Sequence, residues 1–340
     1  MAANKQFFIG IDVSKPWFDA SVMVIENHIK QPIITRRFEN TKDGIKVFEK
    51  WLKTLKVTFD NNTLLVMENT GYYHRLIWSF CSRTNLPIHI GNAAHIKWSF
   101  GIARGKNDTI DSIRLCQYAC KEADILKATP PLDSDLLLLK DLITARAKLV
   151  LQFNSIKAHI KELKSVSDTA IKMLMEKAHK DAIAGIKKSI KIIEDQIHKI
   201  IAANQDIYKN YRLLITVPAI GHFTAAYMIC CTNNFAGKIT GKQLACYAGV
   251  VPFEHSSGIS VKGKQRVHKM ANKDLKKMLH LCAMVAIQFY PEFTTYYKRK
   301  KAEGKHSISI LNAIRNKLVL RAVAVVNNQR PYVDNVNKAA

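Results

Sequence analysis

The sequence has few acidic residues for its length. Its 340 residues contain 27 Asp and Glu against 52 Lys and Arg, which gives a formal net charge of +25. So large a cationic excess is unusual for a metabolic enzyme and indicates a polyanionic partner, nucleic acid above all. The alternative that charge alone leaves open is a merely basic soluble protein, for example one associated with ribosomes.

Paired cysteine motifs and long apolar runs are also absent. The seven cysteines form no pair of CxxC motifs, which argues against a zinc ribbon, and their odd number fits a reducing compartment. No run approaches the ~20 apolar residues that span a bilayer, and the polar start of the chain does not resemble a signal peptide. We therefore expect a soluble, cytoplasmic protein with no membrane partner.

The first third of the chain alternates strand and helix patterns. We expect strands over 7–13, 18–25, 33–38 and 63–67, helices over 42–55 and 73–83, a strand over 86–90 and a helix over 108–122. A meander of three strands followed by alternating helices and strands is the order of an α/β RNase H-like (RuvC-like) domain, predicted here over residues 1–130. Half of an actin-like kinase domain has the same order.

The middle of the chain, residues 131–207, has a different pattern. Apolar residues recur every three or four positions from Leu138 to Leu163 and again from Ile183 to Ile200, with a polar break at 165–168. This heptad spacing predicts two long helices in an antiparallel hairpin or coiled-coil arm. A plain helical bundle within one domain is the alternative.

Residues 208–340 are predicted to form a mainly α-helical C-terminal domain. The segment from Leu214 to Ala226 resembles a helix-hairpin-helix turn, in which backbone N–H groups at a helix start can contact a DNA phosphate, although Ala219 stands where such turns usually have glycine. A simple connection between helices is equally compatible with the pattern. A basic surface follows, and we expect it to contact phosphates through Lys262, Lys264, Arg266, Lys269 and Lys273.

Four acidic residues of the first domain form a candidate metal site. Asp12 follows one apolar strand and Glu68 ends another, while Asp108 and Asp111 lie three residues apart at a predicted helix start and therefore share a face. Carboxylates that converge in this way suit Mg²⁺ or Mn²⁺, and two such ions would activate one oxygen and stabilise another in phosphoryl transfer. Taken singly, each acid has a structural explanation, for example Asp108 as a helix N-cap.

Ordered motifs along the chain resemble one known family. The segments 8–15, 67–73 and 104–111, and in the C-terminal half 243–252, 256–258 and 269–275, are similar to the DEDD transposases of the Piv/MooV type. These are insertion-sequence recombinases with a RuvC-like domain and a second transposase domain, and some members choose their DNA with a noncoding bridge RNA. The resemblance covers nearly the whole chain and is least specific in the helical middle.

The resemblance implies a set of site residues. Asp12, Glu68, Asp108 and Asp111 would be the acidic tetrad that binds Mg²⁺ (or Mn²⁺). Ser257, or its neighbour Ser256, would attack DNA and form a covalent intermediate, a role that residue chemistry alone does not assign because a hydroxyl needs activation. The basic residues expected to contact nucleic acid are Arg104, Lys106, Lys262, Lys264, Arg266, Lys269 and Lys273.

If the acids lie in the first domain and Ser257 in the second, the two must meet. A heptad arm between them favours a meeting across protomers, so we expect a dimer or tetramer that acts on DNA, with a noncoding guide RNA as a further partner. The rival readings are a Holliday-junction nuclease that hydrolyses DNA, a catalytically inactive nucleic-acid-binding protein and an actin-like kinase. The kinase is disfavoured because the sequence lacks a later glycine-rich phosphate loop.

Overall fold

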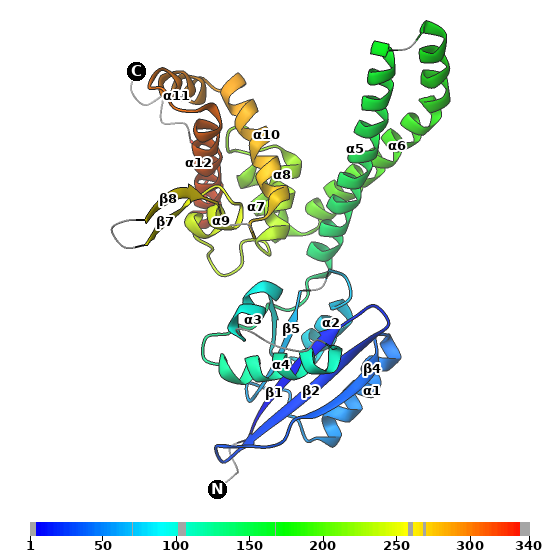
Figure 1. Ribbon diagram of the computed structural model, residues 1–340, viewed down its shortest axis with the longest axis vertical. Helices are drawn as coiled ribbons and strands as arrows, with labels where there is room; N and C mark the ends of the chain where they lie inside the picture. Colours follow the sequence, from blue (N-terminus) through cyan, green and yellow to red (C-terminus); the bar gives the residue numbers. More distant parts are fainter. Residues whose placement is uncertain are drawn as a thin grey trace. The chain divides into compact units, whose positions relative to one another are not determined.

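The computed structural model divides the chain into two compact units, residues 1–132 and residues 133–340 (Figure 1). Each unit has a hydrophobic core of its own. The residues that the structure describes are 5–69, 71–100, 107–166, 168–257, 261–267 and 270–333.

A six-stranded mixed sheet forms the centre of the first unit. Its strands are β1 (Lys5–Val13), β2 (Trp17–Glu26), β3 (Ile29–Lys30), β4 (Ile34–Glu39), β5 (Thr63–Glu68) and β6 (Ile88–Gly91). The strand order is β3-β2-β1-β5-β6, with β4 also paired to β2. β1 is central, antiparallel to β2 and parallel to β5, and β5 is parallel to β6. This topology is compatible with the predicted RNase H-like domain.

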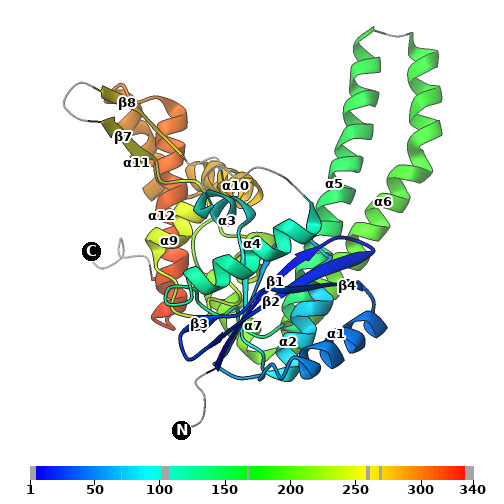
Figure 2. The ribbon, with the colours of Figure 1, turned by 60° about the horizontal axis from the view of Figure 1, so that its bottom comes forward.

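Helices cover both faces of this sheet. They are α1 (Lys42–Thr54), α2 (Arg75–Thr84), α3 (Ala93–Ser99) and α4 (Asp108–Lys121), of which only the short α3 was not expected from the sequence. Side chains alternate along a strand, so Phe7, Ile9 and Ile11 of β1 pack with α1 and α2. Phe8 belongs to the other face and packs with Leu115 and Cys116 of α4. Figure 2 shows α4 lying across the strands.

Helix α4 lies directly against β1 because Gly10 has no side chain. A Cβ atom at Gly10 would be 2.0 Å from the backbone nitrogen of Cys116 and 2.2 Å from the carbonyl oxygen of Ser112. The buried hydroxyl of Ser21, on the neighbouring strand β2, is hydrogen-bonded to the hydroxyl of Ser112 of α4 at 2.8 Å. This contact between small residues fixes where α4 crosses the sheet, and hence where its first turn lies.

The second unit begins with two long helices, α5 (Ser134–Val166) and α6 (Thr169–Ala203), which pack side by side (Figure 1). Arg146 Nε contacts Glu194 Oε1 at 2.7 Å, and further along the rings of His159 and His179 are 6.3 Å apart. The two residues of the histidine pair are closer together in sequence than those of the ion pair, because they lie nearer the connecting turn. The two helices are therefore antiparallel.

The apolar stripe of this helix pair departs from the sequence pattern at one end. Leu138 was expected in the stripe, but it is 50% exposed. Leu136, Leu139 and Ile143 are buried instead, because the start of α5 packs into the core of the second unit. That core therefore sets the rotation of α5 there.

The described residues of the second unit form six more helices and a β-hairpin. They are α7 (Gln205–Leu214), α8 (His222–Cys231), α9 (Gly241–Tyr247), β7 (Phe253–Ser257), β8 (Val261–Arg266), α10 (Lys273–Phe289), α11 (Pro291–Ala302) and α12 (Ser307–Asn327). The hairpin was not expected from the sequence, which predicted a mainly helical domain. Within the described ranges, none of the helices combines the length and apolar character needed to cross a bilayer.

The turn between α7 and α8 shows why glycine is usual at the position that Ala219 occupies. Ala219 has a positive φ of 63°, a left-handed conformation in which a Cβ is disfavoured and glycine is preferred. The chain therefore keeps the glycine-type backbone of this turn with an alanine. Gly221 follows as the N-cap of α8.

Candidate active site

Two of the predicted acids end neighbouring parallel strands. Ile11 of β1 is in register with Met67 of β5, so Asp12 and Glu68 follow at the same level of the sheet. Alternation places Asp12 on the face of Phe8 and Glu68 on the face of Val66, and Phe8 and Val66 share one core cluster. Both carboxylates therefore belong to the sheet face that α4 covers.

The other two predicted acids lie in the first turn of α4. Asn107, and not Asp108, is the N-cap: its side chain accepts a hydrogen bond of 2.7 Å from the backbone N–H of Ile110. This frees the carboxylate of Asp108 from the capping role that was the structural alternative. The helix dipole favours negative charge at this end, where Asp108 and Asp111 both lie.

Burial and negative charge together perturb Asp12. Its surroundings raise the pKa of the carboxyl from 3.8 to about 6, with burial as the largest cause. The next contributions come from the charges of Asp108, Asp111, Glu68 and Asp19, in that order. The charges of the other three predicted acids thus act on Asp12 at one end of the sheet.

Asp19 is an acidic residue of this face that the sequence analysis missed. It lies directly opposite Asp12 on β2 and is only 2% exposed. Arg37 of β4 neutralises it through two hydrogen bonds, from Nε at 3.1 Å and from Nη2 at 2.7 Å. The signal in the sequence was an aspartate between the apolar residues Phe18 and Ala20, in a strand that pairs with the strand of Asp12.

Arg37 and Trp17 also hold Asp108. The indole Nε1 of Trp17 donates to Asp108 Oδ2 at 3.1 Å, and Arg37 Nη2 lies 3.5 Å from the same oxygen. Asp111 is paired with Arg114 of its own helix at 3.0 Å. Asp108 and Asp111 therefore each have a cationic partner within the protein.

The four carboxylates are the right kind of ligand for a hard divalent cation, but in this structure they are not close enough together to bind one. Carboxylate oxygens are the ligands that Mg²⁺ and Mn²⁺ prefer, and the mutual repulsion at Asp12 is what such a cation would relieve. Over the described part of the chain, however, no three His, Cys, Asp or Glu side chains are grouped closely enough to hold a metal ion. Ligation by Asp108 would require its carboxylate to exchange Arg37 and Trp17 for the ion.

The predicted nucleophile lies at the end of a short hairpin in the second unit. Ser257 is the last residue of β7 and pairs with Val261 of β8, while Ser256 pairs with Lys262. For Ser256, Ser257, Lys262, Lys264 and Arg266 the structure describes the backbone only. Of the other predicted nucleic-acid contacts, Lys273 is exposed at the start of α10, and Arg104, Lys106 and Lys269 lie outside the described residues.

The turn that leads into this hairpin is fixed by close packing. Gly249 has a positive φ of 65°, and a Cβ there would be 2.5 Å from the Cβ of Ala271. Asn272 caps α10 by accepting from the N–H of Leu275, and its amide donates to the hydroxyl of Tyr247 at 2.9 Å. Two motifs quoted from the sequence, at 243–252 and 269–275, are therefore in contact.

Known protein families match segments in both units of the chain. Residues 9–164 match the DEDD transposase model of the IS110 type, and residues 211–298 match the model described as transposase IS116/IS110/IS902 family. The chain is 27% identical to the pilin gene-inverting proteins of Moraxella bovis and of Moraxella lacunata, over 97% of this chain and 99% of each of theirs. It is 28% identical over 40% of its length to an insertion element IS110 protein of Streptomyces coelicolor, 33% of which is covered. Since the two models follow each other in one chain and the full-length relatives have the same extent, the chain belongs to the IS110-type DEDD transposases and is a DNA recombinase.

Proposed function

We propose that this transposase cuts and rejoins DNA in a divalent-metal-dependent reaction with a covalent serine–DNA intermediate. The observation that carries the proposal is the placement of Asp12, Glu68 and the first turn of α4 at one end of the sheet, where burial and then the charges of the other acids raise the pKa of Asp12. Acids that destabilise one another without a cation are a feature of sites built for one.

The metal would be held by the four carboxylates of this site. Asp12, Glu68, Asp108 and Asp111 are the candidate ligands, and Asp108 and Asp111 would have to separate from Arg37, Trp17 and Arg114 to bind the ion. When bound, Mg²⁺ or Mn²⁺ polarises a phosphoryl oxygen and stabilises charge on the attacking and leaving oxygens. Arg37 would then balance Asp19 alone.

Ser257 is the proposed nucleophile, with Ser256 as the adjacent alternative. Its hydroxyl oxygen attacks a phosphorus of the DNA backbone and loses its proton, and His255 is a candidate base for that proton. The new bond to the serine oxygen replaces the bond to the leaving strand, which departs with a free hydroxyl. Attack by the hydroxyl of another strand reverses the step and completes the exchange. Cations at Lys262, Lys264 and Arg266 would offset the charge on the phosphate.

Two partners of the reaction are part of the proposal. The α5–α6 hairpin is proposed as a coiled-coil arm that joins two or four copies, so that the acids of one protomer act with Ser257 of another. A noncoding guide RNA is proposed to select the DNA, as in some relatives. The outcome of the reaction is transposition or, as in the relatives named for pilin gene inversion, inversion of a segment.

The test is a search for a protein–DNA adduct. The protein is purified with its bound nucleic acid, that nucleic acid is sequenced, and the complex is incubated with Mg²⁺ and DNA that carries the ends of the mobile element. A denaturing gel then reports any covalent adduct. We expect an adduct with the wild-type protein, none with Ser257→Ala and none with Asp12→Ala.

Each alternative gives a different result in that experiment. Loss of the adduct in Ser256→Ala but not in Ser257→Ala would move the nucleophile by one residue. Cleavage without an adduct, unchanged in Ser257→Ala, would favour hydrolysis and a junction nuclease. Neither cleavage nor adduct would favour an inactive binding protein, and a discrete RNA in the preparation would support guidance.

A further inference from the structure

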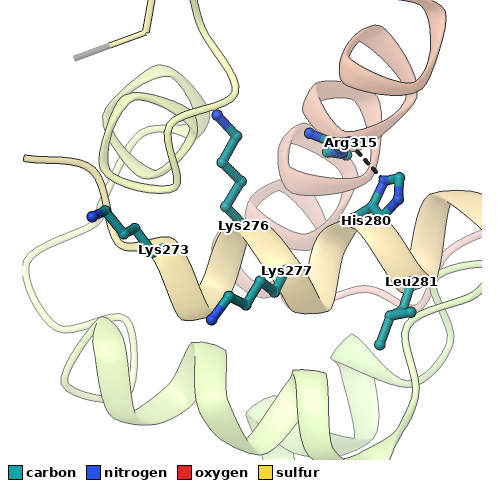
Figure 3. Close-up of a pocket in the computed structure, with 6 residues that line it drawn as sticks. All are labelled: Lys273, Lys276, Lys277, His280, Leu281 and Arg315. Atoms are coloured by element: carbon teal, nitrogen blue, oxygen red, sulfur yellow. Dashed lines mark hydrogen bonds between the residues drawn. The ribbon is translucent and has the colours of Figure 1, made fainter. Parts of the chain in front are cut away.

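A pocket lined mainly by basic residues, whose exposed surface is formed mostly by their carbon atoms, opens on the second unit between α10 and α12 (Figure 3). It is lined by Lys273, Lys276, Lys277, His280, Leu281 and Arg315. Lysine, arginine and histidine thus make up the lining apart from one leucine, and no acid is among these residues. Only Lys273 of this set was expected to contact nucleic acid.

Arg315 at the back of the pocket is a buried cation that pairs with no carboxylate of the described residues. Arg315 is only 7% exposed, and its Nη2 donates a hydrogen bond to His280 Nδ1 at 2.6 Å. The Nε atom is buried and, within the described residues, has no hydrogen-bond partner. Burying an unpaired guanidinium donor is costly, so such a group in a native protein needs an explanation, and a bound anion is one that also supplies the missing counter-charge.

A second arginine of the same helix shows what a structural arginine looks like here. Arg321, 18% exposed at its side chain, bonds both oxygens of Glu292 at 2.6 Å and 2.8 Å. Arg321 also keeps one buried nitrogen, Nη1, without a hydrogen-bond partner, but Glu292 balances its charge. Among the described residues Arg315 has no acidic partner, and the group it contacts is a neutral hydrogen-bond acceptor. The missing counter-charge, and not the unpartnered nitrogen alone, distinguishes Arg315.

The α10 side of the pocket is a stripe of basic residues. Lys273, Lys276 and His280 recur at helical spacing, while Leu275 and Leu279 on the other side of the helix are buried in the core. Since Arg315 can only donate, Nδ1 of His280 accepts and the neutral ring carries its proton on Nε2. Burial and the charge of Arg315 lower the pKa of both Lys276 and His280, because the positively charged forms are disfavoured beside another buried cation.

The pocket adjoins the turn that leads into the β7–β8 hairpin. The Cδ of Lys276 would lie 3.7 Å from a Cβ at Gly249. One turn before Arg315 on α12, the amide of Asn312 donates to the carbonyl of Val250 at 2.7 Å. The same two helices therefore form the pocket and hold the base of the hairpin that carries Ser257.

We propose that this pocket binds a phosphodiester group of the DNA substrate, with Arg315, Lys276 and His280 as its hydrogen-bond donors. The proposal rests on the function proposed above, because that function supplies DNA as the polyanion. An oxyanion satisfies the Arg315 guanidinium and the cationic stripe of α10 at once. A phosphate held beside the turn at Gly249 would fix the register of the DNA backbone relative to the hairpin.

The test is the salt dependence of DNA binding. Affinity for a short duplex is measured by fluorescence anisotropy at several salt concentrations in EDTA, so that no cleavage step contributes. We expect Arg315→Met to weaken binding about tenfold or more and to reduce the slope of log affinity against log salt by about one. Arg321→Met is the matched control, and its slope should equal that of the wild type.

Thermal unfolding separates binding from structure. A binding role leaves the melting temperature of Arg315→Met at or above that of the wild type, because an unpaired buried cation has been removed. If Arg315→Met does not fold, the partly exposed Lys276→Met replaces it, with the same expected loss of slope. An unchanged slope in the folded variants would overturn the proposal.

Two other results are also decisive. A loss of slope with an RNA duplex but not with a DNA duplex would overturn the assignment to DNA. A changed slope together with a failed adduct experiment would leave the pocket standing and remove the recombinase chemistry, because the binding assay needs no metal and no Ser257. The two proposals therefore fail separately.

Discussion

The carboxyl of Asp12 is partly buried at the end of a strand and lies near other acids, and these surroundings make the stability of the folded protein depend on pH. Between pH 3.8 and about 6, the folded protein keeps a proton on Asp12 that the unfolded chain has lost. The raised pKa therefore makes the folded state less stable as pH rises through this range, and the cost is complete above it. The full shift corresponds to about 3 kcal/mol, and solvent screening at this partly exposed group reduces it to about 1–2 kcal/mol.

We therefore expect Asp12→Asn to be more stable than the wild type near neutral pH in the absence of divalent metal. Urea unfolding in EDTA at about pH 8 should show a gain of about 1–2 kcal/mol, and the gain should shrink toward pH 5. Asp19→Asn is the matched control on the neighbouring strand, and it should lose about 1–3 kcal/mol because it leaves Arg37 without its partner. A gain at Asp12 that does not depend on pH would contradict the electrostatic explanation.

A divalent cation should reverse this balance. Mg²⁺ or Mn²⁺ bound at the acidic site is expected to raise the melting temperature of the wild type, because a ligand that binds only the folded state stabilises it. The increase should weaken as pH falls below about 6, where protons compete with the metal for Asp12.

The variant that tests the metal site is Glu68→Gln. It should lose most of the metal-dependent increase in melting temperature, since an amide is a weaker ligand for a hard cation. Asp43→Asn, an exposed acid of α1 paired with Lys46, should keep the increase. Equal responses of the two variants would mean that the metal acts elsewhere.

At the scale of elements, the contact of α4 with β1 decides where the acids meet. Gly10→Ala places a Cβ against the backbone of Cys116 and Ser112, which belong to the helix itself and cannot rotate away. We expect this variant to lose about 1–3 kcal/mol of stability and to displace Asp108 and Asp111 from Asp12. The perturbation of Asp12 should then shrink, which NMR titration of its carboxyl carbon can follow.

The control for this variant is Gly185→Ala in α6. A Cβ there meets nothing within 4 Å, so the change removes a helix-weakening glycine and should stabilise the protein by up to about 1 kcal/mol. Denaturant midpoints of the two alanine variants should move in opposite directions. A Gly10→Ala protein as stable as the wild type, with an unchanged Asp12 titration, would show that α4 is held by other contacts.

Elements with strong local patterns were predictable, and contacts between distant segments were not. The apolar strand before Asp12, the strand ending on Glu68 and the helix beginning at Asp108 all follow from periodicity in the sequence. The ion pair of Arg37 with Asp19 depends on strand pairing, so it has no local signal. The exposure of Leu138 depends likewise on packing remote in sequence.

The pocket at Arg315 shows the same division within the second unit. The basic stripe at Lys273, Lys276 and His280 can be read from one helix, but its depth comes from an arginine 35 positions beyond His280 in the chain. Nothing in the local sequence distinguishes Arg315 from Arg321. Only the partner of each, Glu292 for one and His280 for the other, separates a structural role from a binding role.

For the whole molecule, the proposed function places the acidic site and Ser257 in different units of the chain. The two groups can meet within one protomer or between protomers, and a mixture of two inactive variants distinguishes these cases. In a composite site between protomers, a heterodimer of Asp12→Ala and Ser257→Ala contains one site with both native groups and one site with neither. In a site within one protomer, every site of the mixture lacks one group.

We expect the mixture to recover adduct formation. If subunits exchange at random in a dimer, half of the molecules are heterodimers and half of their sites are intact, so activity should reach about a quarter of the wild-type value. Each variant alone is the control and should form no adduct. Light scattering of the same samples, with and without nucleic acid, must show an oligomer. A monomer under both conditions, or a mixture as inactive as its components, would place Asp12 and Ser257 of one chain in the same site, and the α5–α6 arm would then need another role.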